Sequence, residues 1–77
     1  MTAWRERASE IASECRRTLD TLDFCLVGSV SIERRRTPGA HTFVVSGGGE
    51  PQYESRSIGS AIDELVRRFH KTTQETP

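Results

Sequence analysis

The segment from Ser57 to Lys71 carries an uninterrupted helical stripe of apolar residues, which constrains the fold more than any other feature of the sequence. Counted from Ile58, the apolar positions fall at i, i+3, i+4, i+7, i+8 and i+11, which is one face of an α-helix. They are Ile58, Ala61, Ile62, Leu65, Val66 and Phe69. A helix with a single apolar face must cover an apolar surface, and the preceding residues must therefore supply one.

A second apolar stripe predicts a helix from Thr2 to about Leu22. Its positions again follow a helical spacing, and the outer face mixes glutamates with arginines, as is typical of a solvated helix face. The stripe consists of Trp4, Ala8, Ile11, Ala12, Cys15, Leu19 and Leu22. The turn-forming segment Asp20–Asp23 then ends the helix.

Residues from Phe24 to about Arg36 alternate with a period of two, which predicts one long strand. The positions expected beneath the helices are Phe24, Leu26, Gly28, Val30 and Ile32. The positions expected on the opposite, open face are Cys25, Val27, Ser29, Ser31, Glu33 and Arg35. The strand is thus expected to bury its even-numbered residues.

A Pro38–Gly39 turn joins this strand to a returning strand from His41 to Ser46, because proline suits the second position of a tight turn and glycine suits the third. The turn should place Ile32 opposite Val45, in phase with the apolar face. A glycine-rich loop then leads to a short third strand from Gln52 to Arg56.

The predicted fold class is α+β, with the order α-β-β-β-α and a three-stranded antiparallel sheet that packs both helices on one face. At 77 residues, the chain is expected to form a single compact domain over residues 1–71, followed by a flexible polar C-terminal tail over residues 72–77. The open face of the sheet should be mostly polar, with apolar spots at Cys25, Val27 and Val44.

Composition limits the classes of partner. The formal net charge is zero, which disfavours nucleic acid, and 34% of the residues are hydrophobic without any run long enough to span a membrane. The N-terminus lacks the apolar core of a signal peptide, so the expected location is cytoplasmic. Cys15 and Cys25 are accordingly expected to be free, reduced thiols.

No motif of the sequence supports catalysis, a metal or a cofactor. The triple glycine Gly47–Gly49 lacks the Lys-Ser/Thr of a phosphate-binding loop, and the cysteine spacing does not fit a zinc site. Cys25 and His41 should lie far apart along neighbouring strands, without a third residue to orient them. The chain is therefore expected not to be an enzyme and to need no cofactor.

An arginine cluster at the end of the predicted hairpin is the polar feature that most favours a binding site. Such a cluster can bind phosphate or an acidic patch of a protein. The alternative is a solvated strand end, whose charges block unwanted pairing. The candidate binding residues are Arg34, Arg35, Arg36 and His41.

The order α-β-β-β-α, with Pro38-Gly39-Ala40-His41 in the hairpin loop, resembles the double-stranded-RNA-binding domain over most of the chain. The resemblance implies RNA binding. That family opens its last helix with a lysine cluster, whereas this sequence has Ser57 to Ala61 there, followed by Asp63 and Glu64. Nucleic-acid binding by a degenerate domain of this kind is therefore the alternative function.

The expected function is that of a small non-enzymatic binding module that acts through protein-protein contact. Chains of this size and style are frequent among phage and mobile-element products that bind host complexes, so an inhibitor or adaptor of that kind is expected. A homodimer through the open sheet face is a further alternative.

Overall fold

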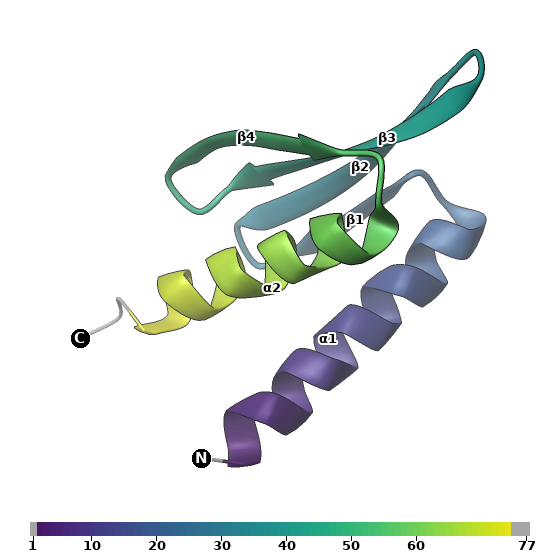
Figure 1. Ribbon diagram of the computed structural model, residues 1–77. Helices are drawn as coiled ribbons and strands as arrows, with labels where there is room; N and C mark the ends of the chain where they lie inside the picture. Colours follow the sequence, from purple (N-terminus) through teal and green to yellow (C-terminus); the bar gives the residue numbers. More distant parts are fainter. Residues whose placement is uncertain (1, 75–77) are drawn as a thin grey trace.

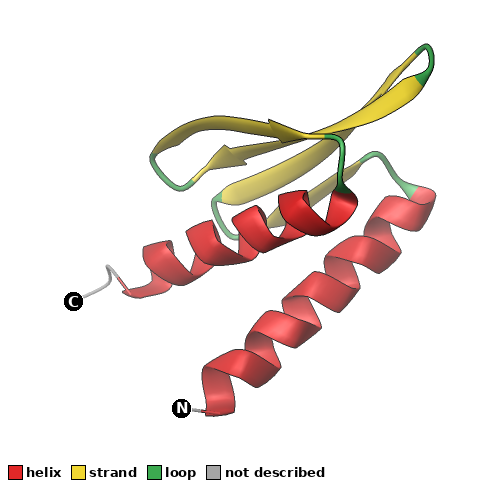
Figure 2. Ribbon diagram, viewed as in Figure 1, coloured by secondary structure: helices red, strands yellow, loops and turns green. Residues whose placement is uncertain are grey.

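Residues 2–74, which the computed structural model describes, form an antiparallel sheet of four strands with two helices packed on one of its faces (Figures 1 and 2). The elements are α1 (Thr2–Thr21), β1 (Phe24–Val27), β2 (Val30–Thr37), β3 (Ala40–Gly47), β4 (Glu50–Ser55) and α2 (Ile58–Gln74). The strands lie in the order β1-β2-β3-β4, and each is antiparallel to its neighbour. The α+β class is thus confirmed, whereas the prediction of three strands is wrong for this range.

The predicted first strand is in fact two strands, joined by a two-residue turn at Gly28 and Ser29. Val27 pairs with Val30 across this turn. Gly28 adopts a φ of 60°, which glycine tolerates better than other residues, and Gly-Ser is a favourable pair for a two-residue hairpin. The alternation of apolar residues conceals the turn because it continues through Gly28.

The turn reverses the faces of β1. Because Val27 lies opposite Val30, the odd-numbered residues of β1 share a face with the even-numbered residues of β2. The assignment of Cys25 and Val27 to the open face is therefore wrong, since Cys25 is buried and Val27 packs against the core. The assignment of Phe24 and Leu26 beneath the helices is also wrong, since these side chains are 50% and 62% exposed.

The Pro38–Gly39 turn and the register of β2 with β3 agree with the prediction. Ile32 lies opposite Val45, and Gly39 has the positive φ, 84°, that the third position of this turn favours. The β2–β3 hairpin that results projects away from both helices (Figure 1).

The last third of the chain departs from the prediction at the boundaries of its elements. Gly48 and Gly49 make another two-residue turn, so β4 begins at Glu50 and not at Gln52. α2 continues to Gln74, so residues 72–74 belong to the helix and not to the predicted tail. Residues 75–77 of that tail lie outside the described residues.

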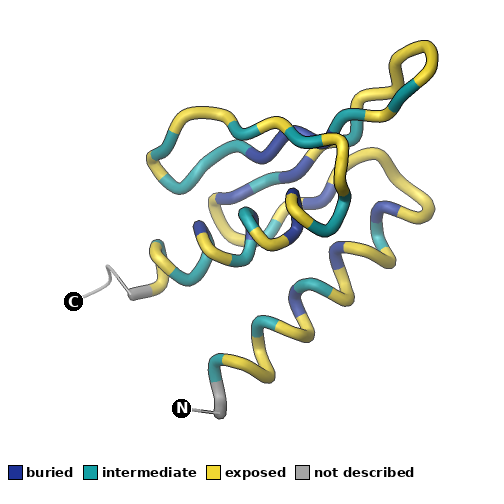
Figure 3. Tube along the Cα trace, in the orientation of Figure 1, coloured by how far each residue is buried: buried dark blue, intermediate teal, exposed yellow. Residues whose placement is uncertain are grey.

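The core lies between the sheet and the helices (Figure 3). α2 packs against β2, β3 and β4, whereas α1 packs against β1 and α2. The buried apolar cluster consists of Ile11, Cys15, Leu19, Cys25, Val30, Ile32, Phe43, Val45, Ala61, Ile62 and Leu65. Leu22, which belongs to the predicted stripe of the first helix, is 60% exposed because it lies beyond the end of α1.

Arg68 is buried, although its charge suggests a place on the polar face of α2. Its guanidinium donates to the carbonyl oxygens of Gly47 at 3.0 Å and Pro51 at 2.6 Å, and its Nε donates to the Glu64 carboxylate at 2.8 Å. Gly48 passes so close that a Cβ there would lie 3.1 Å from the Cβ of Arg68. The triple glycine is therefore part of a tight turn around a buried arginine.

Candidate functional site

Asp23, in the connection between α1 and β1, binds two of the predicted site arginines. Arg34 donates from Nε to Asp23 Oδ1 at 2.9 Å, and Arg36 donates from Nη2 to the same oxygen at 3.1 Å. These bonds hold the pKa of the Asp23 carboxyl below its ordinary value, and the bond from Arg34 has the larger effect. The Arg34 side chain is only 16% exposed, so little of its guanidinium is open to a partner.

Arg35 and His41 lie at the same end of the sheet but in different surroundings. Arg35 projects from the opposite face to its neighbours in the strand, and its Nε lies 3.5 Å from Glu33 Oε1. His41 is exposed and lies opposite Arg36 across the hairpin. The predicted site residues thus meet at one hairpin but are divided between the two faces of the sheet.

Two carboxylates reduce the positive charge of this hairpin. Asp23 pairs with Arg34 and Arg36, and Glu33 pairs with Arg35. The Arg35 and Arg36 side chains nevertheless remain 49% and 63% exposed. The hairpin therefore offers two accessible guanidinium groups, and nearby carboxylates offset most of its positive charge.

Three large apolar side chains are exposed next to Asp23. Leu22, Phe24 and Leu26 are 60%, 50% and 62% exposed, and we call these three residues the β1 surface. Leu22 and Phe24 flank Asp23 in the chain, so the apolar surface adjoins the carboxylate that binds the arginines. Sequence reasoning missed this surface, and the Gly-Ser pair after β1 is the signal of a two-residue turn that could have revealed it.

The open face beside the β1 surface is polar. Phe24 lies opposite Glu33 on β2. Val44, which was expected as an apolar spot on this face, lies between Glu33 and Glu54 and is only 2% exposed. The β1 surface thus has a polar rim on the side of β2.

β1 is an edge strand whose outer side presents free backbone groups. The Arg34 N–H donates to the Asp23 carbonyl oxygen at 2.8 Å, which makes these residues a hydrogen-bonded pair. Such pairs alternate in an antiparallel ladder, so the peptide groups of Phe24 and Leu26 point away from β2. The other edge strand, β4, contains Pro51 and two glutamates, which oppose pairing with a further strand. The β1 edge is therefore the better suited of the two to accept one.

Residues 2–74 contain no group of three or more His, Cys, Asp or Glu side chains that could hold a metal ion. No helix in this range is long and apolar enough to cross a membrane. Cys25 lies beside Cys15 and not beside a histidine, whereas His70 stacks on Trp4 with ring centroids 3.9 Å apart.

No family model, curated protein or solved structure matches the chain. The order of elements in residues 2–74 also differs from that of the double-stranded-RNA-binding domain, because β1 and β2 take the place of a single first strand. Pro38 and Gly39, which carry part of that resemblance, do form the predicted turn.

Proposed function

We propose that the chain is a small non-enzymatic binding module that acts through protein-protein contact. The observation that carries this proposal is the β1 surface, whose three large apolar side chains are at least half exposed. Contiguous exposed apolar side chains with a polar rim are typical of protein interaction sites. Arg35 and Arg36 lie on the adjacent strand, and arginine is enriched together with aromatic residues at the centres of interfaces.

The partner would meet three kinds of group at this end of the sheet. Phe24 and Leu26 would fill apolar pockets, and the exposed arginines would pair with carboxylates. The free edge of β1 would accept backbone hydrogen bonds from an extended segment of the partner. Arg34, which is bound to Asp23 and largely buried, would make little direct contact with the partner.

Nucleic-acid binding through the hairpin arginines and His41 is the alternative proposal. The projection of the β2–β3 hairpin away from the helices favours it, because such a hairpin can enter a groove (Figure 1). The zero net charge of the chain disfavours it. Asp23 and Glu33 also disfavour it, since both carboxylates neutralise arginines that would otherwise meet phosphates.

More specifically, we propose a cytoplasmic inhibitor or adaptor that binds a host complex. Proteins of this kind are found among phage and mobile-element products. The small size of the chain supports this more specific proposal. A second copy of the chain, bound through the open face, is an alternative partner. The side chains of Phe24 and Leu26 on that face support the alternative.

The proposal is tested by affinity capture from a bacterial lysate with the tagged full-length chain and two double variants. Phe24→Ser with Leu26→Ser removes apolar anchors, and Arg35→Ala with Arg36→Ala removes the exposed guanidinium groups. Both pairs are exposed, so we expect unchanged circular dichroism. We also expect each variant to lose the same captured protein. Folded variants that capture it as well as the parent does would refute the proposal.

A matched control is Gln52→Ala, which alters an exposed side chain on the opposite edge of the sheet and should leave capture unchanged. The nucleic-acid alternative predicts a gel shift with duplex RNA or DNA that weakens steeply with salt. In that case, Arg35→Ala with Arg36→Ala should reduce the salt slope by about two phosphate contacts. Sedimentation of the free chain distinguishes a homodimer from a complex with a foreign protein.

A further inference from the structure

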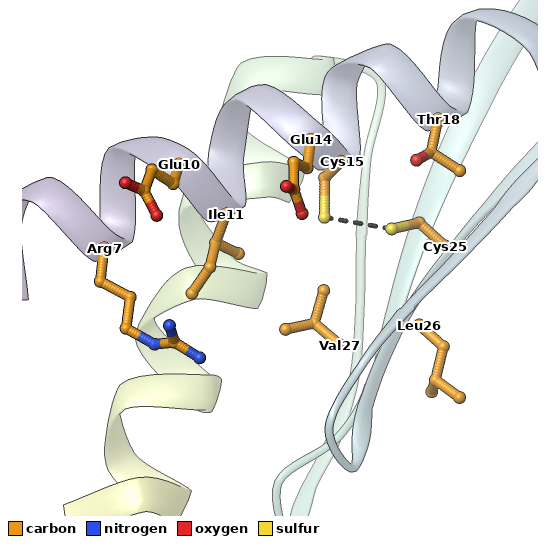
Figure 4. A pocket seen from close by; sticks show the side chains of 9 residues that line it. All are labelled: Arg7, Glu10, Ile11, Glu14, Cys15, Thr18, Cys25, Leu26 and Val27. Carbon is orange, nitrogen blue, oxygen red and sulfur yellow. Dashed lines mark hydrogen bonds between the residues drawn. The ribbon is translucent and has the colours of Figure 1, made fainter.

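Cys15 and Cys25 bring two thiols together in the core from different elements. Cys15 lies on α1 and Cys25 on β1, and both are buried, free thiols. Their Sγ atoms are 3.2 Å apart, as the dashed line in Figure 4 shows. The packing of α1 on β1 sets this distance, so the two sulfurs remain neighbours for as long as the fold persists.

A pocket of about 330 Å³ between α1 and β1 leads to the two sulfurs. Besides both cysteines, its walls include exposed side chains that connect it to the surface: Arg7, Glu10, Glu14 and Leu26 (Figure 4). A water molecule takes up about 30 Å³, so the pocket has room for a molecule as small as hydrogen peroxide. The Cys25 thiol at the wall of this pocket is thus shielded from large reagents but can be reached by a small oxidant.

We propose that Cys15 and Cys25 form a reversible redox site, which reacts with a small peroxide and closes to a disulfide between α1 and β1. First, the Cys25 sulfur attacks one peroxide oxygen, the O–O bond breaks, and the thiol proton leaves with the displaced oxygen as water. The Cys15 sulfur then attacks the sulfenic acid of Cys25, the S–O bond breaks, and the Cys15 proton leaves with the hydroxyl group as a second water. Two thiols and one hydrogen peroxide give one disulfide and two waters, and a dithiol reductant reverses the oxidation by exchange.

The surroundings of the two cysteines assign their roles. Cys25 is 9% exposed, whereas Cys15 is fully buried. Burial of the side chain is the main cause that raises the pKa of the Cys15 thiol above its ordinary value, and the hydrogen bond with Cys25 is the second cause. The raised pKa disfavours Cys15 as the first nucleophile. Cys25 is therefore the sulfur that attacks the peroxide, and Cys15 is the sulfur that resolves the sulfenic acid.

A disulfide would bring the two sulfurs closer together. The sulfurs must approach by about 1 Å to reach the bond length of about 2.05 Å. The bond would close a ring over the connection from α1 to β1, which contains Leu22 and Asp23. The redox site does not depend on what the β1 surface binds, so the two proposals stand or fall separately.

The test treats the folded full-length chain with hydrogen peroxide, then unfolds it without reductant, alkylates it and measures the intact mass. We expect a monomer that has lost two hydrogens and carries no alkyl group. Dithiothreitol before alkylation should restore two alkylated cysteines. Two free thiols after peroxide treatment, or disulfides between chains in place of one within the chain, would overturn the proposal.

Two serine variants test the assigned order of reaction. In Cys15→Ser, Cys25 should stop at a sulfenic acid that dimedone traps. In Cys25→Ser, Cys15 should resist the same peroxide treatment and remain a thiol. The reverse pattern would overturn the order, and circular dichroism establishes that each variant is folded. For the parent chain, the oxidised form should melt higher, on the order of 10 °C, and a lower Tm would show that the native packing does not accommodate the bond.

Discussion

At the scale of single residues, Arg68 joins α2 to the β3–β4 turn through backbone carbonyl groups. The register shifts between Val45 and Gly47, and the carbonyl oxygens of Gly47 and Pro51 accept from the Arg68 guanidinium. Both bonds are partly buried, and Glu64 supplies the balancing charge at 2.8 Å. One side chain of α2 thereby holds the turn against the helix.

Arg68→Met should destabilise the fold by roughly 2–4 kcal/mol, because methionine keeps much of the apolar stem but leaves the carbonyl oxygens of Gly47 and Pro51 without this donor. Arg67→Met is the matched control, since the neighbouring Arg67 side chain is 52% exposed. Urea denaturation should show a large loss for Arg68→Met and a small change for Arg67→Met. Equal midpoints for the two variants would contradict the role given to Arg68.

Acid should weaken the fold through its ion-paired carboxylates. The hydrogen bond from Arg67 is the main cause that lowers the pKa of Glu64 and of Glu50, and the bond from Arg34 does the same for Asp23. A carboxyl whose folded pKa is depressed contributes stability above its ordinary pKa and loses that contribution as the pH falls through the folded value. The melting temperature should therefore be steady at neutral pH and fall below about pH 4.

Glu64→Gln checks this pH dependence, because glutamine cannot titrate. The Tm of this variant should start lower at pH 7 and decline less between neutral and acidic pH than the Tm of the parent. A parallel decline in both proteins would show that Glu64 contributes nothing to the acid sensitivity.

At the scale of elements, α2 and the β2–β3 hairpin could be predicted because local sequence determines them. The apolar stripe beginning at Ile58 has a helical period, and the Pro38–Gly39 turn determines the register of β2 with β3. β1 could not be placed in the same way, because all four of its residues, Phe-Cys-Leu-Val, are apolar. The sequence of β1 therefore does not show which of its two faces is buried. The turn at Gly28 determines this, because it sets the pairing of β1 with β2.

That turn also packs against α2, which makes Gly28 more sensitive than Gly39 to replacement by alanine. Both glycines have a positive φ, and an alanine in this backbone conformation destabilises the fold by about 1–2 kcal/mol. A Cβ at Gly28 would lie 3.0 Å from Cε1 of Phe69, whereas nothing lies within 4 Å of a Cβ at Gly39. Urea denaturation should therefore show a larger loss for Gly28→Ala than for Gly39→Ala, and an equal loss would contradict the contact with Phe69.

At the scale of the whole molecule, the candidate site arises where distant segments meet. The arginines of β2 were evident from the sequence, but Asp23 comes from the α1–β1 connection, and only the fold brings it to Arg34 and Arg36. The burial of Arg68 was hidden for a similar reason, because its partners belong to a turn 17 to 21 positions earlier in the chain. Contacts between segments so far apart leave no periodic signal in the sequence.

The sheet also gives the molecule two unlike edges. β4 presents Pro51 and glutamates, whereas β1 presents Phe24 and Leu26 together with their outward peptide groups. The helices cover the other face of the sheet (Figure 2). The β1 edge therefore combines the exposed side chains of Phe24 and Leu26 with outward backbone groups, and Arg35 lies on the same open face. The proposed binding surface therefore exists only if β1 turns back at Gly28 as a separate strand.

The most direct measurement of this claim is the unfolding free energy of Leu26→Ser and of Val27→Ser in the same denaturant titration. Leu26 is 62% exposed and Val27 packs against the core, so Leu26→Ser should cost within about 0.5 kcal/mol and Val27→Ser roughly 1–3 kcal/mol. A single continuous strand from Phe24 to Arg36 reverses the order, because it buries Leu26 and exposes Val27. A large loss for Leu26→Ser with little loss for Val27→Ser would contradict both the β1 turn and the proposed binding surface that depends on it.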